Sequence, residues 1–360
     1  MDPKDPRARN SYDFVRFIAA SAVLFSHHFA LSQIPEPAVP LYGEDFGKLA
    51  VEVFFSLSGF LICRSLQKTT DWAQFVSARF LRIFPNLTFA LVTASLATLI
   101  WYQNYPHLWL HVKFVLKNLL MFIRGVTYAI PGVFEDNKAN AAIDVPLWSL
   151  PIELWMYVAL FLLFRLGGRR SGLLILAAAV IFSIVWYITP ATRGPSIGPL
   201  ELFQLARLGS FFLSGAILAF CWPYMEKNAV AIGFFALAAV VLLGKHLPDA
   251  SIFRSLAIAT MVVGLGSSRA MAWFSKGGDA SYGMYIFAWP IQQFSLLLID
   301  SFWLSMIVAF TATTVFGYAT WHGFEKRAMS WRRRFAELMQ RSAGAIGGAR
   351  LVKVEPRSPP

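Results

Sequence analysis

Runs of apolar residues about 20 long alternate with short polar stretches along most of the chain. A helix of about 20 residues crosses the hydrocarbon core of a bilayer. Backbone that faces lipid must be hydrogen-bonded within its own helix or in a closed barrel, and the sequence lacks the alternating strands of a barrel. The pattern therefore predicts an all-α, polytopic helical bundle with about ten transmembrane helices, at 11–33, 49–66, 84–103, 146–166, 172–190, 201–220, 229–247, 252–267, 281–299 and 302–323.

The composition agrees with a membrane protein. Of the 360 residues, 57% are hydrophobic and only 14% are charged, whereas soluble domains carry about 25% charged residues. Such a chain has too few polar side chains to cover a globular surface, so lipid must cover it. We predict a multi-pass protein of the cell inner membrane, with the lipid bilayer as a partner.

The net charge of +12 is distributed as in a membrane protein, and we expect no nucleic-acid partner. With the N-terminus in the cytoplasm, the basic loops after the second and fourth predicted spans and the basic C-terminal tail all face inward. An excess of Lys and Arg in cytoplasmic loops is the rule for such proteins. The distribution predicts that both termini are cytoplasmic.

Three parts follow along the chain: a basic cytoplasmic arm (1–10), a membrane domain (11–328) and a basic, disordered cytoplasmic tail (329–360) that lies against anionic headgroups. Between the third and fourth spans, the stretch LWLHVKFVLKNLLMF places Lys113 and Lys117 four residues apart. We expect an amphipathic helix that lies in the interface over the bundle. The two cysteines predict neither a disulfide nor a metal framework.

Arg16 and His27 share one face of the first predicted span. They are 11 residues apart, which on a helix is about 20° past three full turns and a rise of ~16 Å. Asp13 precedes Arg16 by three residues and can pair with it. Arg16 alone is explained by snorkelling to the headgroups, but an imidazole at the depth of His27 indicates a functional role.

Two carboxylates are predicted at the depth of His27, Glu52 in the second span and Glu153 in the fourth. A carboxylate beside an imidazole fixes its tautomer and raises its basicity. Intramembrane carboxylates indicate a functional site by default. In the same span as Glu52, the small residues Ser58 and Gly59 favour close helix packing.

Arg79 and Arg82 lie three residues apart, on one face of a helical turn just before the third span. Two arginines with this spacing can clamp phosphates. The alternative is that they only set the topology. None of the other histidines lies at the depth of His27, so we expect neither a haem nor a metal.

The motifs, taken in order, resemble acyltransferase family 3, the polytopic membrane O-acyltransferases. The matching stretches are DFVRFIAASAVLFSHH, VEVFFSLSGFLI, RFLRIFP, WSLPIELWMY and SYGMYIFAWPIQQ. Two positions depart from the pattern of many relatives. Glu52 stands in place of Asp, and Ala288 in place of a histidine, so no second catalytic imidazole is expected there.

The resemblance implies transfer of an acyl group, usually acetyl, from cytoplasmic acyl-CoA to a hydroxyl of a cell-surface carbohydrate or its lipid-linked precursor. Acyl-CoA is then a co-substrate, and no cofactor is permanently bound. His27 would act as general base, oriented by Glu52 or Glu153; transient acylation of His27 is the alternative. Arg16, Arg79 and Arg82 would bind the CoA phosphates. The expected pocket residues are Ser58, Trp148, Ser149, Tyr157, Ser281 and Tyr282.

Two rival functions use the same residues. In a proton-coupled exporter, His27 and the two carboxylates would form a proton relay. The sequence shows no two-half repeat of the kind many transporters have, and the arginine pair would have no purpose. The other rival, a non-catalytic scaffold for polysaccharide assembly, predicts that His27→Ala has no effect.

Overall fold

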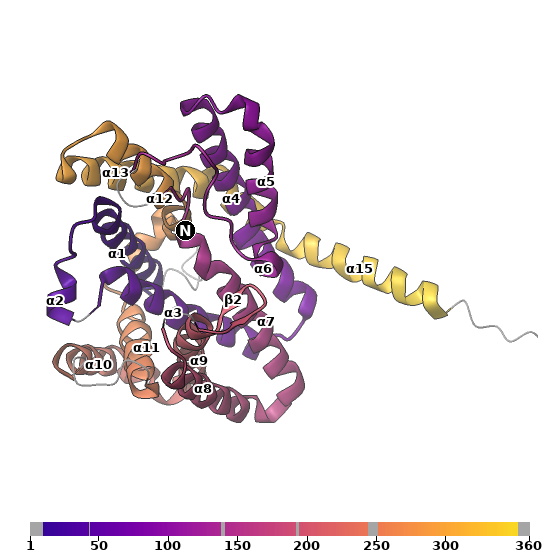
Figure 1. Ribbon diagram of the computed structural model, residues 1–360. Coiled ribbons are helices and arrows are strands. Elements are labelled where there is room, and N and C mark those ends of the chain that lie inside the picture. Colours follow the sequence, from indigo (N-terminus) through magenta and orange to yellow (C-terminus); the bar gives the residue numbers. More distant parts are fainter. Residues whose placement is uncertain (1–9, 43, 138–140, 192–193, 244–250, 352–360) are drawn as a thin grey trace, which may run out of the picture.

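The computed structural model describes residues 10–42, 44–137, 141–191, 194–243 and 251–351 and is almost entirely helical (Figure 1). Of the predicted N-terminal arm, only Asn10 belongs to the described residues. Two short antiparallel strands, β1 (Ser196–Ile197) and β2 (Leu200–Glu201), form a hairpin. The α-helices are α1 Tyr12–Ser32, α2 Ala38–Tyr42, α3 Phe46–Lys68, α4 Trp72–Trp101, α5 Leu108–Leu119, α6 Met121–Arg124, α7 Ser149–Gly167, α8 Ser171–Ile188, α9 Leu202–Met225, α10 Ala229–Leu243, α11 Ile252–Gly266, α12 Ser281–Leu298, α13 Phe302–Thr320, α14 Lys326–Ser330 and α15 Arg332–Leu351.

A helix lies over every predicted span, which agrees with an all-α membrane protein. Six helical segments are long and apolar enough to cross a bilayer among the residues that the structure describes. Two of these segments each contain two successive helices, α7 with α8 and α9 with α10. The number of crossings and the side on which the termini lie remain predictions.

Helix α4 is longer than the predicted third span, which was expected to begin at 84. It starts at Trp72 because Asp71 caps it: the Asp71 carboxylate accepts hydrogen bonds from the backbone N–H groups of Ala73 and Gln74. Arg79 and Arg82 therefore lie inside a continuous helix rather than in a separate turn before it.

Helices α3 and α9 form the centre of the bundle and approach each other through glycines. A Cβ atom on Gly59 would lie 1.8 Å from the carbonyl oxygen of Phe212, and one on Gly215 would lie 1.9 Å from that of Ser56. Any larger side chain at either position would push the helices apart. The close packing predicted at Gly59 is confirmed, and it fixes the position of α3.

The amphipathic helix expected to lie over the bundle instead runs back along α4, as α5 and α6 (Figure 1). Ser95 contacts His111 near the end of α4, and Phe122 reaches the ring of Phe84 farther down that helix. The indole N–H of Trp155 in α7 also donates to the Phe122 carbonyl. The interfacial placement was wrong because α5 has a second buried stripe, at His111, Phe114 and Asn118, which packs against its neighbours.

The predicted disorder of the tail (329–360) is also contradicted in part. Helix α15 covers most of it, and residues 352–360 lie outside the described residues. The helix docks on α4, where the ring of Phe335 stacks on that of Phe80. This apolar contact was hidden by the Gly- and Pro-rich composition of the last residues of the chain.

Candidate active site

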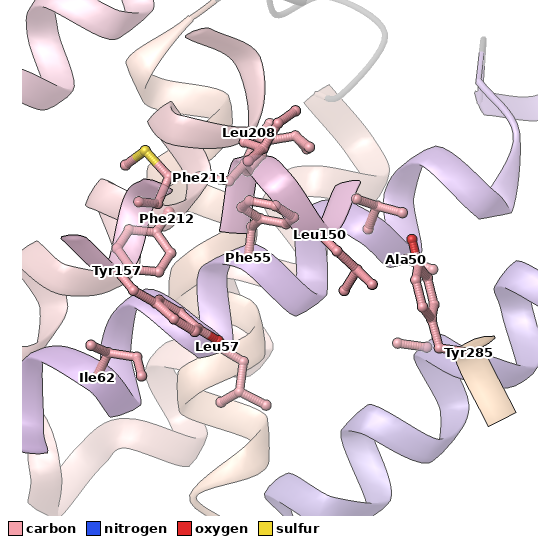
Figure 2. Packing of buried hydrophobic residues seen from close by; sticks show 14 of the residues in the cluster. Ala50, Phe55, Leu57, Ile62, Leu150, Tyr157, Leu208, Phe211, Phe212 and Tyr285 are labelled. Carbon is pink, nitrogen blue, oxygen red and sulfur yellow. The ribbon is translucent and has the colours of Figure 1, made fainter. Parts of the chain in front are cut away.

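A cavity of about 150 Å³ lies between α1, α3, α4, α7 and α12. All but three of the predicted site residues line it; the exceptions are His27, Glu52 and Trp148. Its polar lining consists of Arg16, Ser58, Arg79, Arg82, Ser149, Glu153, Tyr157, Ser281, Tyr282 and Tyr285. Figure 2 shows Phe55 and Leu150, two of its apolar lining residues, between Tyr157 and Tyr285. The cavity joins residues from distant parts of the sequence.

One end of the cavity, the Arg16 end, carries a network of ion pairs. Arg82 donates to Asp279 over 2.6 Å, and Arg16 donates to the same carboxylate over 3.4 Å. Arg16 also pairs with Asp13 over 3.0 Å, as the sequence predicted. Burial alone would raise the pKa of Asp279, but Arg82 and Arg16 outweigh this and lower it to about 2. Asp279 is therefore ionised at any physiological pH.

A π-helical turn, η7 (Trp321–Glu325), adds a second carboxylate to this network. Glu325 accepts from Arg82 over 3.1 Å and from the Asn86 side chain over 2.5 Å. Such turns change which residues face a neighbour, and they occur often at functional sites. Asp279, Glu325 and Asn86 were missed in the sequence. A signal existed for Asp279, which stands two residues before the recognised SYGMYIFAWPIQQ stretch.

Arg79 differs from Arg82 in having no carboxylate partner. It forms no ion pair with any residue that the structure describes, and its Nε atom is buried without a hydrogen-bond partner. Its guanidinium lies 5.5 Å from the ring centroid of Phe75 and 5.7 Å from that of Tyr157. The aromatic rings hold the cation in place while its charge remains available to an anion.

Glu153 lies in the wall of the cavity and is hydrogen-bonded by two hydroxyls. Ser58 donates to it over 3.2 Å, and Tyr157, one turn farther along α7, donates to the same oxygen. Because its other oxygen takes no part in either bond, Glu153 presents a polar group to whatever enters the cavity.

Glu52 does not have the place that the sequence suggested. It is fully buried and pairs with Arg207 of α9 over 3.1 Å and with Arg254 of α11 at 3.8 Å. Arg254 in turn binds Glu44. The depth of Glu52 in the span was read correctly, but its side chain faces α9 and α11. Its contacts make it a structural residue that joins α3 to these helices.

His27 lies one helical turn beyond the Tyr285 end of the cavity. Its ring packs edge-on against Trp289, with the centroids 5.0 Å apart, and Trp289 follows Tyr285 by four residues, about 6 Å along α12. Its Nδ1 atom is buried and has no hydrogen-bond partner among the described residues. His28, in contrast, is held by Ser305 over 3.0 Å and serves the packing of α1 on α13.

The Tyr285 end of the cavity is built by the segment before α7. The Tyr285 hydroxyl contacts the Ser149 hydroxyl over 2.6 Å and donates to the carbonyl of Pro146 over 3.0 Å. Trp148 packs against the apolar core without lining the cavity. Just before this segment, burial raises the pKa of Asp144 well above its usual value.

The last two predicted pocket residues, Ser281 and Tyr282, lie at the Arg16 end. Ser281 donates to Asp279 over 2.5 Å, and the Tyr282 hydroxyl donates to the carbonyl of Ile83 over 3.0 Å. Within the described ranges, no group of three or more His, Cys, Asp or Glu side chains comes together as a metal site would require.

Comparison with known proteins places this arrangement in context. Residues 9–322 match the family described as acyltransferase domain. The chain is 28% identical to an O-acetyl transferase of Shigella phage Sf6 over 331 residues, which are 89% of this chain and 96% of that protein. It is 24% identical to nodulation protein 10 of Rhizobium leguminosarum bv. viciae over 353 residues, 90% of this chain and 94% of that protein.

A further similarity covers a smaller part of the chain. It is 26% identical to the peptidoglycan O-acetyltransferase OatA of Listeria monocytogenes over 206 residues, 51% of this chain and 31% of that protein. No solved structure matches the chain.

Proposed function

This chain belongs to the acyltransferase domain family and is an O-acetyltransferase, and we propose that it transfers an acetyl group from acetyl-CoA to a hydroxyl of a cell-surface carbohydrate or its lipid-linked precursor. One observation carries the proposal: Arg79, a cation without a carboxylate partner among the described residues, lines one end of a cavity whose other end lies one helical turn from His27.

The donor fits the cavity by length and by charge. Its phosphates bind at the Arg16 end, chiefly to Arg79, since Arg82 is already paired with Asp279. The pantetheine arm runs through the cavity toward Tyr285 and places the thioester near His27. The distance to be bridged is the ~16 Å rise between Arg16 and His27 along α1.

His27 acts as the general base. It accepts the proton of the acceptor hydroxyl while that oxygen attacks the thioester carbonyl carbon. The bond between carbon and sulfur then breaks, and the CoA thiolate leaves and takes up the proton from His27. The unpartnered Nδ1 of His27 supports this role, because a purely structural buried histidine is normally hydrogen-bonded through both nitrogens, as His28 is.

The acceptor class follows from the named relatives and from the placement of His27. O-acetyl transferases are among the chains to which this one is similar, and one of these acts on peptidoglycan by name. The positive-inside distribution supports cytoplasmic termini in a cell inner membrane, with the Arg16 end facing cytoplasmic acyl-CoA. His27 would then lie in the outer half of the bilayer, where surface carbohydrates are reached.

The experiment that separates this function from a proton-coupled exporter follows the thiol of CoA in proteoliposomes. With acetyl-CoA outside and extracted surface polysaccharide present, we expect free thiol to appear together with ester-bound acetate. The matched control is His27→Ala at equal protein content, which should release thiol only at the background rate. Acetyl-CoA that remains intact with the wild-type protein would contradict the proposal and favour export.

A further inference from the structure

Three more cavities lead outward from the Arg16 end of the central cavity. The first, of about 350 Å³, shares Arg16, Arg79 and Arg82 with the central cavity. The next two have volumes of about 230 and 390 Å³. Arg332 lines all three, and Arg333 lines the outer two. The shared lining residues show that the cavities adjoin, so together they form a vestibule to the active site.

Both of these arginines belong to the first turn of α15, which is held in place by contacts with α4. The rings of Phe335 and Phe80 stack with centroids 5.6 Å apart and planes inclined by 8°. The side-chain amide of Gln340 donates to both carboxylate oxygens of Asp71, over 3.2 and 3.0 Å. The docked helix therefore presents its first turn to the vestibule at a defined position.

The two outer cavities are cationic. They are lined by Arg79, Lys326, Arg332 and Arg333, and no Asp or Glu is among their lining residues. In the part of the chain that the structure describes, none of these four side chains forms an ion pair. Like charges gathered around one concave surface repel each other unless an anion with several charges binds between them.

The carboxylates of the network lie farther in. Asp13 and Asp279 line the first cavity, and Arg16 and Arg82 already bind them. The charge that remains available therefore increases outward, from Arg79 to Arg332 and Arg333. Guanidinium groups bind phosphate oxygens in a bidentate manner, so this part of the vestibule suits a phosphorylated ligand.

We propose that Arg332 and Arg333 bind the 3′-phosphate of the CoA nucleotide, an inference that rests on the proposed function and extends its donor site. With the thioester in the central cavity and the diphosphate at Arg79, the ribose lies beyond the diphosphate. Its 3′-phosphate is then the phosphate group nearest the outer cavities. The C-terminal helix is thus a part of the donor site, in addition to being a surface element.

The test compares acetyl-CoA with 3′-dephospho-acetyl-CoA, which lacks only this phosphate. For the wild-type protein we expect the KM of the dephospho donor to be about tenfold to a hundredfold higher, since charge-assisted hydrogen bonds contribute at least one such factor. In the double variant R332A/R333A the ratio should fall to near one. Its KM for the dephospho donor should stay close to that of the wild type.

Matched controls keep the result specific. Arg341→Ala removes an exposed cation from the same helix without touching the vestibule and should keep the wild-type ratio. R332K/R333K keeps the charge and should retain most of it. A wild-type ratio that persists in R332A/R333A overturns the inference. So does a KM that changes with the content of anionic lipid in the liposomes while the ratio stays constant, because the arginines would then bind headgroups.

Direct binding separates this inference from the proposed function. In calorimetric titration with CoA itself, without transfer, the wild-type protein should bind CoA more tightly than dephospho-CoA. Failure to bind either nucleotide would contradict the proposed donor as well. Equal discrimination by the wild type and R332A/R333A would leave the donor intact and refute only the role of these two arginines.

Discussion

The guanidinium of Arg82 donates to the carboxylate of Asp279 over 2.6 Å, although the two residues are 197 positions apart in the chain. Glu325 takes a second N–H of the same guanidinium. Of the two arginines in RFLRIFP, Arg82 therefore joins α4 to the ends of α12 and α13, whereas Arg79 keeps a charge to offer to a ligand. The two should behave differently when substituted.

Arg79→Ala should weaken donor binding and leave the fold intact. The expected rise in the KM for acetyl-CoA is about tenfold or more, because one charge-assisted phosphate contact is lost. Arg82→Ala should instead lower the apparent Tm in detergent, since it leaves two carboxylates without their cation. Both quantities are measured for both variants; equal effects of the two substitutions on KM and Tm would refute this division of roles.

Asp279 gives a pH dependence with a defined sign. Its pKa of about 2 lies below the value of about 3.9 for an unfolded aspartate. Its ionised form therefore stabilises the fold fully above pH 4, by on the order of 2 to 3 kcal/mol, and this contribution is lost as the pH falls through 2. Asp279→Asn should lower the apparent Tm at pH 7, and the difference from wild type should shrink only below pH 4. A difference that is already gone at pH 5 would contradict the assignment.

His27 and His28 are adjacent, yet their variants should fail in different ways. His27→Ala should lower kcat by about 10²- to 10⁴-fold, the usual effect of a general base, at an unchanged apparent Tm. His28→Ala removes the contacts with Ser305 and Gln292 and should mainly lower the Tm. Measuring kcat per folded molecule separates the two. If His28→Ala alone abolishes turnover in a stable protein, the base has been assigned to the wrong histidine.

Glu52→Gln should destabilise the protein without affecting the chemistry. The substitution breaks a buried ion pair with Arg207, which costs about 3 to 5 kcal/mol when one partner is removed. The apparent Tm should drop, while the folded fraction should retain the wild-type kcat. The opposite result, a normal Tm and a lost kcat, would return Glu52 to the side of His27, where the sequence had suggested it.

The sequence predicted the helices well because a membrane span is a local signal. Length and apolarity suffice to find a helix at every predicted span, and the shared face of Asp13 and Arg16 follows from helical periodicity alone. The same local signals set the depth of Glu52 and Glu153. They do not say which neighbouring helix a side chain faces.

That missing information explains the errors. Glu52 was placed beside His27 because both lie at one depth, but rotation around α3 turns it toward Arg207. The π-helical turn that brings Glu325 to Arg82 has no reliable sequence signal. The path of α5 along α4 and the docking of Phe335 on Phe80 depend on packing between segments that the sequence alone does not pair.

The measurement that tests the account most directly is the O-acetyl content of cell-surface polysaccharide from a strain lacking this chain, rescued with wild type or His27→Ala at equal membrane levels. The account predicts that ester-linked acetate returns with the wild type only. Equal acetylation with both proteins would show that His27 is not the catalytic base, and no acetylation with either would contradict a surface carbohydrate as the acceptor.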